Sequence, residues 1–492
     1  MVSSRNEELM TALINGEDIK DYIPRSRNEQ FLKDCAVGSE TTTLEPRSRS
    51  EMLLSEVHNK IKSGGSDAIK EILDITKSAK YLFVGSTGYV TDLTYSPSSS
   101  DTVYSKIDYN YFSFSKILNF DTTSNVTDMV YMFYKMYKIK RVPLFDTSKV
   151  TNMSYMFNEC MSLIEVPLFN TSNVTNMNGM FYSCGNLVEV PAFDTSNITN
   201  MSYMLYNCNS LRKAPLFNTS NVTNMAGMFG CGWYRGSVPG NKYITELPLY
   251  DTSNVTNMSH AFNGLRKIKT VPLFDTSNVT DMSYMFGDSQ SSVDRLLERV
   301  PLFNTSKVTN MAGMFHQCGH LTEVPMFNTS NVTSMSEMFY YCESLIEVPA
   351  FDTSNVTSMG SMFRGCTSLK KINSLNLIKV TYASNIIYLC KKIEYIKLLN
   401  VKVSIQIGSG TSWGHLIQKD CLIQIISELI KPSSGTCTLT MGSANTAKLA
   451  DTYVKLLEDD GSGKYPFELC ESTAEGAMTI TDYCLYKNWQ LA

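Results

Sequence analysis

The chain repeats one short text, and the repetition leaves few folds open. An aromatic residue followed by Asp-Thr or Asn-Thr, as in Phe274-Asp275-Thr276, returns every 24 residues over most of residues 120–375. The aligned residues are Phe120, Phe145, Phe169, Phe193, Phe217, Tyr250, Phe274, Phe303, Phe327 and Phe351, with a degenerate eleventh copy at Leu375. A period this strict predicts a solenoid, and its length lies in the leucine-rich-repeat range of roughly 20–29 residues.

The period is broken twice, near residues 230–243 and near residues 287–298. Because the frame is kept on both sides, we interpret these stretches as insertions that form loops at one coil of the solenoid. Solenoids often bind partners through such insertions. The first insertion contains Trp233, Tyr234, Arg235 and Tyr243, and aromatic and Arg residues are common in binding hot spots. We therefore predict a binding site there, although packing of the loop onto its own coil explains these residues equally well.

Each repeat unit has two parts. Leu163, Val166 and Leu168 have the L-x-x-L-x-L spacing of a short strand whose inward side chains alternate. The following apolar residues predict one face of a short helix: Val174, Met177, Met180, Phe181 and Cys184. A proline follows the strand valine in nearly every copy, so each strand is expected to be about three residues long or to end at the proline. The predicted fold is an α/β solenoid of about 11 units.

Several residue types form columns when the repeats are aligned. Eight cysteines do so, and we expect buried thiols rather than disulfides or metal ligands: Cys160, Cys184, Cys208, Cys231, Cys318, Cys342, Cys366 and Cys390. The Phe column is expected in the core. The Asp/Asn-Thr-Ser-Asn text is expected to cap helices and to bond the turn, rather than to be glycosylated at Asn-x-Thr. His316 and His320 could hold zinc with Cys318, but solvent-exposed histidines are the simpler reading.

Composition excludes several functional classes. With 43 basic and 47 acidic residues, the chain lacks the charge excess of a nucleic-acid-binding protein. No apolar run is long enough for membrane insertion, and we see no signal peptide or sorting motif. No nucleophile elbow, phosphate loop, dinucleotide fingerprint or zinc-hydrolase motif is present. The column of Glu165, Glu189, Glu323 and Glu347 is expected to be solvated. We therefore expect a non-enzymatic protein that needs no cofactor.

The two ends of the chain differ from the repeats. Residues 4–13, 26–35 and 48–57 each begin with Ser-Arg and carry an apolar stripe, so residues 1–58 are predicted to form short attachment helices that oligomerise. Residues 59–117 are expected to be a linker and N-terminal cap, residues 118–400 the solenoid, and residues 401–492 a small α/β C-terminal cap. In that cap, residues 419–430 are expected to form a helix, and residues 435–461 a strand and then a helix.

Two resemblances extend this interpretation. The text "FDTSNVTNM" followed by Met-Phe and Cys resembles the BspA-like leucine-rich repeats of bacterial surface proteins, over about residues 120–390. The "PRSRNE" repeats of residues 1–58 are similar to those that open structural proteins of phages. Together the resemblances imply a phage virion protein, a tail, baseplate or head fibre. It would attach to other virion proteins by its N-terminus as a homo-oligomer, favoured as a trimer, and present the solenoid to a bacterial receptor. The alternative is a BspA-like adhesin on the bacterial cell surface.

Overall fold

A computed structural model describes residues 126–491, except Pro143, 233–239, 288–294, 410–411, 415, 433–434 and 459. The predicted attachment segment 1–58 and the whole of the predicted linker and N-terminal cap, residues 59–117, lie outside the described residues. The described chain divides into two units, one with Val126 and residues 138–146 and one with residues 127–137 and 147–491. The second unit contains the coils and the C-terminal region, and it is described below. No helix within the described ranges has the length and apolarity of a membrane span.

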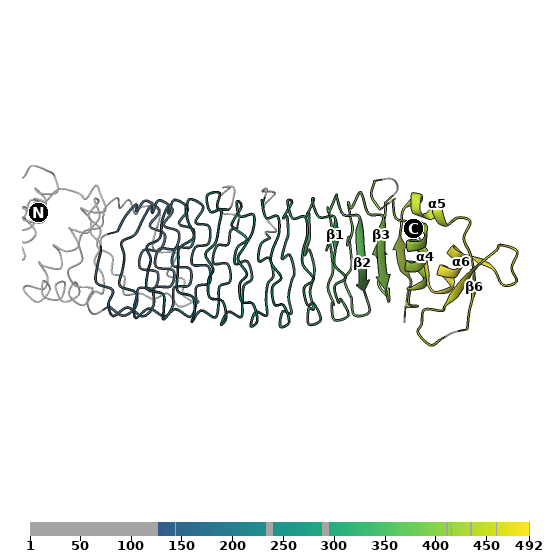
Figure 1. Cartoon of the computed structure of the whole chain (residues 1–492), viewed down its shortest axis with the longest axis horizontal. Helices are drawn as coiled ribbons and strands as arrows, with labels where there is room; N and C mark the ends of the chain where they lie inside the picture. The colour runs from purple at the N-terminus through teal and green to yellow at the C-terminus, as the bar shows by residue number, and fades with distance from the viewer. Residues whose placement is uncertain are drawn as a thin grey trace, which may run out of the picture. The chain divides into compact units, whose positions relative to one another are not determined.

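Successive coils stack in sequence order through backbone pairing (Figure 1). One residue per coil forms a parallel bridge with the equivalent residue of the next coil, as Asn152 does with Asn176. The bridged residues are Asp128, Asn152, Asn176, Asn200, Asn224, Asn257, Asp281, Asn310, Ser334, Ser358 and Tyr382. A repeat solenoid is therefore present. Both insertions leave the pairing unbroken, which agrees with their interpretation as loops.

The predicted helix of each repeat unit is wrong. In the described coils from residue 127 to residue 400 this stretch is a chain of turns. The N–H groups of Tyr155 and Phe157 donate to the carbonyls of Asn178 and Met180 in the next coil, both at 2.8 Å. The N–H of Asn158 donates within its own coil to Tyr155 O at 3.0 Å. Because alternate N–H groups serve the neighbouring coil, they cannot close helical bonds to the fourth preceding residue.

The proline in each coil turns the chain and reverses one predicted orientation. The N–H of Phe274 donates to Pro272 O at 3.0 Å, which closes a three-residue turn around Leu273. The same bond recurs in other coils at Pro191, Pro248, Pro325 and Pro349. At the tip of this turn Leu273 points outward and is 62% exposed, and Leu168, at the equivalent position of its coil, is 61% exposed. The prediction that Leu168 faces inward was wrong, whereas Leu163 and Val166 are buried as expected.

Strand length in the coils depends on this proline. The first described strand, β1 (Glu347–Val348), has two residues and stops at Pro349. In the next two coils Asn373 and Lys397 occupy the proline position, and strands β2 (Lys371–Asn376) and β3 (Tyr395–Leu399) run through it. The three strands form one parallel sheet in the order β1-β2-β3. A proline cannot donate to a ladder, so its loss lengthens the strand.

The core is a set of aromatic and methionine columns along the stack. Phe315 is fully buried, and its ring stacks between Phe286 and Phe339 at centroid distances of 5.8 and 5.6 Å. The repeat-aligned Phe column packs beside it, with Phe327 at 6.3 Å from Phe315. The predicted burial of the Phe column is confirmed for its described members.

The polar side chains of the Asp/Asn-Thr-Ser-Asn segment form hydrogen bonds from one coil to the next. Asn170 Oδ1 accepts from Ser172 N and Ser172 Oγ at 3.2 and 2.8 Å, which closes the turn. Thr171 Oγ1 donates to Asp194 O of the next coil at 2.7 Å, and Asn173 Nδ2 donates to Ser148 O of the preceding coil at 2.7 Å. The predicted hydrogen bonding of the turn is confirmed, but no helix is present for these residues to cap.

The cysteine column is buried as free thiols, as predicted. Cys342 Sγ donates to Phe315 O at 3.1 Å, and Cys366 Sγ donates to Phe339 O at 3.0 Å. Cys231 is shifted by one residue within its coil, and its Sγ contacts Asn263 O at 3.6 Å instead. Burial raises the pKa of Cys342 and Cys366 well above the ordinary value of a thiol, so both stay protonated.

These thiols should resist alkylation in the folded chain, because the thiolate is the reactive form. With iodoacetamide at pH 8, we expect Cys342 and Cys366 to remain unmodified while the half-buried Cys437 and Cys470 react. In urea all four should react. Mass spectrometry of peptides measures each site, and equal rates at Cys342 and Cys437 in the native chain would contradict the burial.

The C-terminal region forms an α/β cap with two small sheets. Its elements are β4 (Ile405–Gln406), α4 (Lys419–Ser427), β5 (Cys437–Thr440), α5 (Ser443–Leu449), β6 (Tyr453–Leu456), β7 (Phe467–Cys470), β8 (Met478–Thr479), α6 (Ile480–Tyr486) and β9 (Trp489–Leu491). The sheets have the orders β4-β5-β9, parallel, and β7-β6-β8, antiparallel. The helix predicted at residues 419–430 is confirmed as α4. Residues 453–456, predicted within a helix, form strand β6 instead.

Hydrogen bonds join the cap to the last coils. Gln418 N donates to Glu394 O at 3.0 Å, and Gln424 Nε2 donates to Leu398 O at 2.9 Å. Within the cap, Trp489 is buried and its Nε1 donates to Ile430 O at 2.9 Å. The cap therefore covers the exposed end of the sheet β1-β2-β3, as a solenoid requires.

Lys487 makes the stability of this cap depend on pH. Its side chain is buried, and its Nζ donates to Tyr483 Oη at 2.9 Å and to Lys464 O. Burial lowers the pKa of Lys487 to about 8 from 10.5. Below pH 8 the lysine is charged in both the folded and the unfolded chain, and burial of the charge lowers the free energy of unfolding. Between pH 8 and 10 the folded chain releases this proton first, so that cost declines as pH rises.

We therefore expect Lys487→Met to stabilise the cap near pH 7, by on the order of 3 kcal/mol at most. This advantage should shrink as pH rises from 8 to 10. The difference between the variant and the parent is the quantity to measure, by urea denaturation followed by tryptophan fluorescence. The buried cysteines lower the stability of both chains equally at alkaline pH. A difference that stays constant across this range would contradict the pKa shift.

Candidate binding surface

The predicted binding residues of the first insertion are only partly described. Trp233, Tyr234 and Arg235 lie outside the described residues. Tyr243 is 46% exposed, and its N–H donates to Asn241 Oδ1 at 2.9 Å. The Lys242 Nζ lies over the Tyr243 ring, 5.5 Å from its centroid. Tyr243 is therefore held at its backbone while its ring remains available to a partner.

Asparagine side chains from neighbouring coils hold both roots of this insertion. Asn263 Oδ1 accepts from Cys231 N at 2.9 Å, and Asn207 Oδ1 accepts from Gly232 N at 3.0 Å. At the other root, Asn209 Oδ1 accepts from Gly240 N at 3.2 Å. These three bonds fix where the loop leaves and re-enters the stack, so its roots are well positioned for binding.

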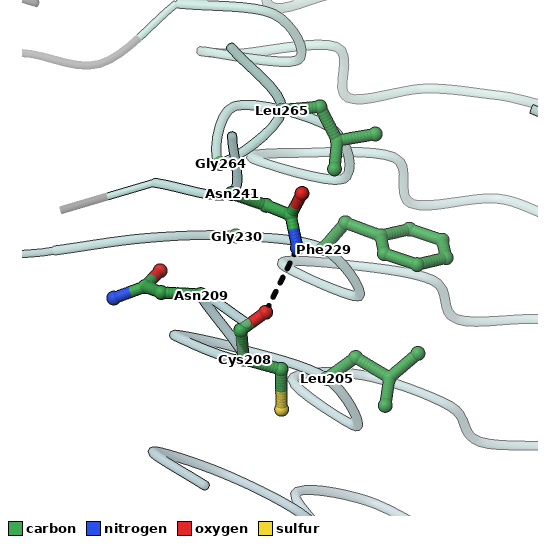
Figure 2. Close-up of a pocket in the computed structure, with 8 residues that line it drawn as sticks. All are labelled: Leu205, Cys208, Asn209, Phe229, Gly230, Asn241, Gly264 and Leu265. Carbon is green, nitrogen blue, oxygen red and sulfur yellow. Dashed lines mark hydrogen bonds between the residues drawn. The ribbon is translucent and has the colours of Figure 1, made fainter. Parts of the chain in front are cut away.

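The Asn241 side chain bonds the end of the first insertion to the preceding coil. Its Nδ2 donates to Cys208 O at 3.0 Å, drawn as a dashed line in Figure 2, and to Leu211 O at 2.7 Å. The side chain borders a hollow with a cavity volume of about 10 Å³. The lining residues are Leu205, Cys208, Asn209, Phe229, Gly230, Asn241, Gly264 and Leu265. A volume of this size holds about one water molecule, so this hollow is a joint between coils rather than a ligand site.

The tips of the proline turns form an outward row of apolar side chains. Six of these side chains are 57–75% exposed, and we call them the leucine row: Leu168, Leu216, Leu249, Leu273, Leu302 and Met326. Four of them, from Leu249 to Met326, occupy consecutive coils, where backbones stack about 4.8 Å apart. Large apolar side chains that are exposed side by side mark interaction surfaces.

The candidate metal ligands occupy different environments. His316 is buried, which corrects the expectation of a solvated side chain. Its ring stacks on Tyr340 at 4.4 Å, and its Nε2 lies 3.7 Å from Glu337 Oε2. His320 is exposed. Among the described residues, no three His, Cys, Asp or Glu side chains gather closely enough to hold a metal ion. The glutamate column is exposed, as expected.

Sequence reasoning missed the leucine row and the asparagine anchors. The signal for the row was present, because a Leu or Met stands between Pro and Phe in most repeats. Strict alternation from Val166 would bury Leu168 and expose Phe169, yet both Val166 and Phe169 are buried. The prediction that Leu168 is buried and the prediction that the Phe column is buried therefore could not both hold in one alternating strand. No comparable signal marked Asn207, Asn209 and Asn263.

The stacked coils and the capped end define a repeat-solenoid protein with its apolar turn tips turned outward. The family model described as "Mycoplasma protein of unknown function, DUF285" matches residues 101–189, 185–233, 238–344 and 321–404. These matches cover more than half of the chain, and the chain belongs to this family. No curated protein sequence matches it.

Solved structures of repeat proteins are similar to this chain at low identity. A leucine-rich repeat protein from Eubacterium ventriosum is 15% identical, with a TM-score of 0.33, over 62% of this chain and 89% of its own. One from Bacteroides ovatus is 16% identical, with a TM-score of 0.26, over 62% and 93%. The functional domain of InlJ from Listeria monocytogenes, described as including a cysteine ladder, is 12% identical, with a TM-score of 0.18, over 64% and 72%.

Proposed function

We propose that this chain is a non-enzymatic binding protein that presents its solenoid to a receptor on a bacterial cell surface. The leucine row carries the proposal. Its side chains are exposed although the same coils bury their Val and Phe residues. A monomer has no structural need for these large apolar tips, since Ala192 and Ala350 occupy the same position in two coils. Contact with a partner explains their size.

The first insertion adds a second group of contacts to this proposal. Trp233, Tyr234, Arg235 and Tyr243 are the residue types that concentrate binding energy in interfaces. The asparagine anchors at the loop roots reduce the entropy that the insertion would lose on binding.

The test is binding of the labelled full chain to whole bacterial cells. We expect the triple variant Leu249→Ser, Leu273→Ser and Leu302→Ser to bind at least about tenfold more weakly, because three adjacent apolar contacts are lost. The matched control changes exposed threonines of the same coils: Thr256→Ser, Thr280→Ser and Thr309→Ser. Equal binding by the leucine variant and the control would contradict the proposal.

Two settings are compatible with such a protein. One is a BspA-like adhesin on the bacterial cell surface, and the family description, which names Mycoplasma, favours a bacterial protein. The other is a phage virion fibre, which the three Ser-Arg repeats of residues 1–58 favour. Antibodies against the chain distinguish the settings, because they would label either intact cells or purified particles.

The proposal includes self-association through residues 1–58, as a trimer in the virion setting. Light scattering of the full chain should then give three times its mass of 55.2 kDa. Deletion of residues 1–58 should return a monomer. If both forms are monomeric, the attachment role of this segment is wrong.

A further inference from the structure

One backbone position in the turn chain has a positive φ in successive coils. Glycine occupies it at Gly179, Gly227 and Gly313, with φ of 58–61°. Tyrosine occupies it at Tyr131, Tyr155, Tyr203 and Tyr284, with φ of 51–56°, and other residue types occupy it at His260, Glu337, Ser361 and Asn385. A bulky residue is strained in this left-handed region, where glycine is not. The backbone alone therefore favours glycine, and tyrosine is the commonest side chain that replaces it in these coils.

The rings of these tyrosines rest on the glycines of the next coil. A Cβ atom at Gly179 would lie 2.3 Å from the Tyr155 ring, and one at Gly227 would lie 2.6 Å from the Tyr203 ring. Each ring thus occupies the space that a side chain of the next coil would fill. The Tyr155 ring also stacks on Tyr131, with centroids 5.1 Å apart, whereas Tyr203 remains 37% exposed.

Two further tyrosines extend this surface. Tyr182 and Tyr206 stack at 4.8 Å with planes 9° apart, and Tyr203 meets Tyr206 edge to face at 5.6 Å. The Tyr206 ring in turn lies against Gly230, where a Cβ would be 2.5 Å away. We name Tyr155, Tyr182, Tyr203 and Tyr206 the tyrosine platform. Because each ring packs on another ring or on a glycine, little rotational freedom remains to be lost on binding.

The platform lies among uncharged polar groups. Segments 176–186, 200–210 and 224–232 contain no Asp, Glu, Lys, Arg or His residue. They supply amides and hydroxyls in the same coils as the rings, including the half-buried Asn178 and Asn200. One carboxylate, Glu159 in the preceding coil, is close enough to Tyr182 to help raise the pKa of that phenol, although burial contributes more. The region is therefore matched to a neutral ligand that carries many hydrogen-bonding groups.

A second aromatic cluster further along the stack differs in this respect. There Tyr284 Oη donates to Glu337 Oε2 at 2.8 Å, and Arg364 lies over the Tyr340 and Tyr388 rings. Its rings already contact charged side chains of the protein itself. The tyrosine platform differs from this cluster, because Glu159 is the one charged group named beside it.

We propose that the tyrosine platform binds a neutral glycan. Each sugar ring has an apolar C–H face that packs on a tyrosine ring, and hydroxyls that exchange hydrogen bonds with the neighbouring amides. A charged polymer would find no counter-charges in the three segments. An apolar peptide would leave the polar amides around the rings unsatisfied. This inference concerns a surface other than the leucine row and does not depend on it.

The experiment applies the labelled full chain to an array of neutral and anionic glycans. We expect binding to neutral glycans, and at least about tenfold weaker binding by Tyr203→Gly. That variant should fold, because glycine already occupies the equivalent position at Gly179 and Gly227, and it relieves the strain at Tyr203. Tyr203→Trp, which keeps an aromatic face, should retain binding.

The leucine-row triple variant is the matched control, and we expect it to bind glycans as the parent does. Several results would overturn the inference: no binding to any neutral glycan, preference for anionic glycans, or equal binding by Tyr203→Gly and the parent. Loss of glycan binding only in the leucine variant would also overturn it. If the leucine-row variant binds cells as tightly as the parent while glycan binding depends on Tyr203, the proposed function alone is wrong.

Discussion

Replacing Phe315 with alanine is expected to destabilise the chain by about 3–5 kcal/mol. The ring is fully buried and stacks on Phe286 and Phe339, while Phe327 packs beside it. Its removal leaves a cavity between three coils, and these coils cannot close it without breaking their inter-coil hydrogen bonds. The free energy of unfolding from urea denaturation, followed by circular dichroism, measures the loss.

Met326→Ala provides the control for this prediction. Met326 lies next to Phe327 in sequence but belongs to the leucine row and is exposed. Its replacement should change the free energy of unfolding by less than about 0.5 kcal/mol. Comparable losses for Phe315→Ala and Met326→Ala would show that the orientations of these side chains are wrong.

Gly264→Ala is expected to destabilise the chain by about 1–3 kcal/mol through a steric clash. A Cβ atom at Gly264 would lie 2.2 Å from Phe229 O and 2.9 Å from Gly230 C, both backbone atoms that no side-chain rotation can move. The Gly264 N–H donates to Phe229 O at 3.0 Å, and Gly264 O accepts from Asn241 N at 2.6 Å. The clash should therefore weaken both bonds and loosen the root of the first insertion.

Hydrogen exchange at the Asn241 amide is the local measurement for Gly264→Ala, and we expect it to accelerate. Gly185→Ala is the matched control, since a Cβ there meets no atom within 4 Å. Its effect should be neutral or stabilising by up to about 1 kcal/mol. If the two alanine variants are equally stable, the coils are not in close contact at Gly264.

Much of the architecture follows from the repeat text. The period of 24 predicted stacked coils, and the columns of Phe and Cys predicted the buried face, because identical positions in stacked coils share one environment. The two insertions were placed correctly, since the bridges at Asn224–Asn257 and Asp281–Asn310 pass across them. The hydrogen-bonding role of Asn170 and Thr171 also followed from residue type.

The local conformation within a coil was harder to predict. Val174, Met177 and Met180 are three residues apart, and this spacing suits a helix face and a chain of turns equally well. The turn chain prevails because Met153, Tyr155 and Phe157 donate their N–H groups to the next coil. Such bonds connect residues 23 positions apart in sequence, and a local pattern carries no information about them.

By itself, the sequence determined that this chain stacks: one apolar unit cannot bury its own face, and 24-residue copies in a constant frame bury one another. Only the tertiary structure decided which way each side chain points. The turn at Pro272 directs Leu273 outward, the neighbouring coil removes the helix, and Gly179 and Gly227 create the space for Tyr155 and Tyr203. These outcomes depend on contacts between coils, whose geometry is set only when the copies are in register.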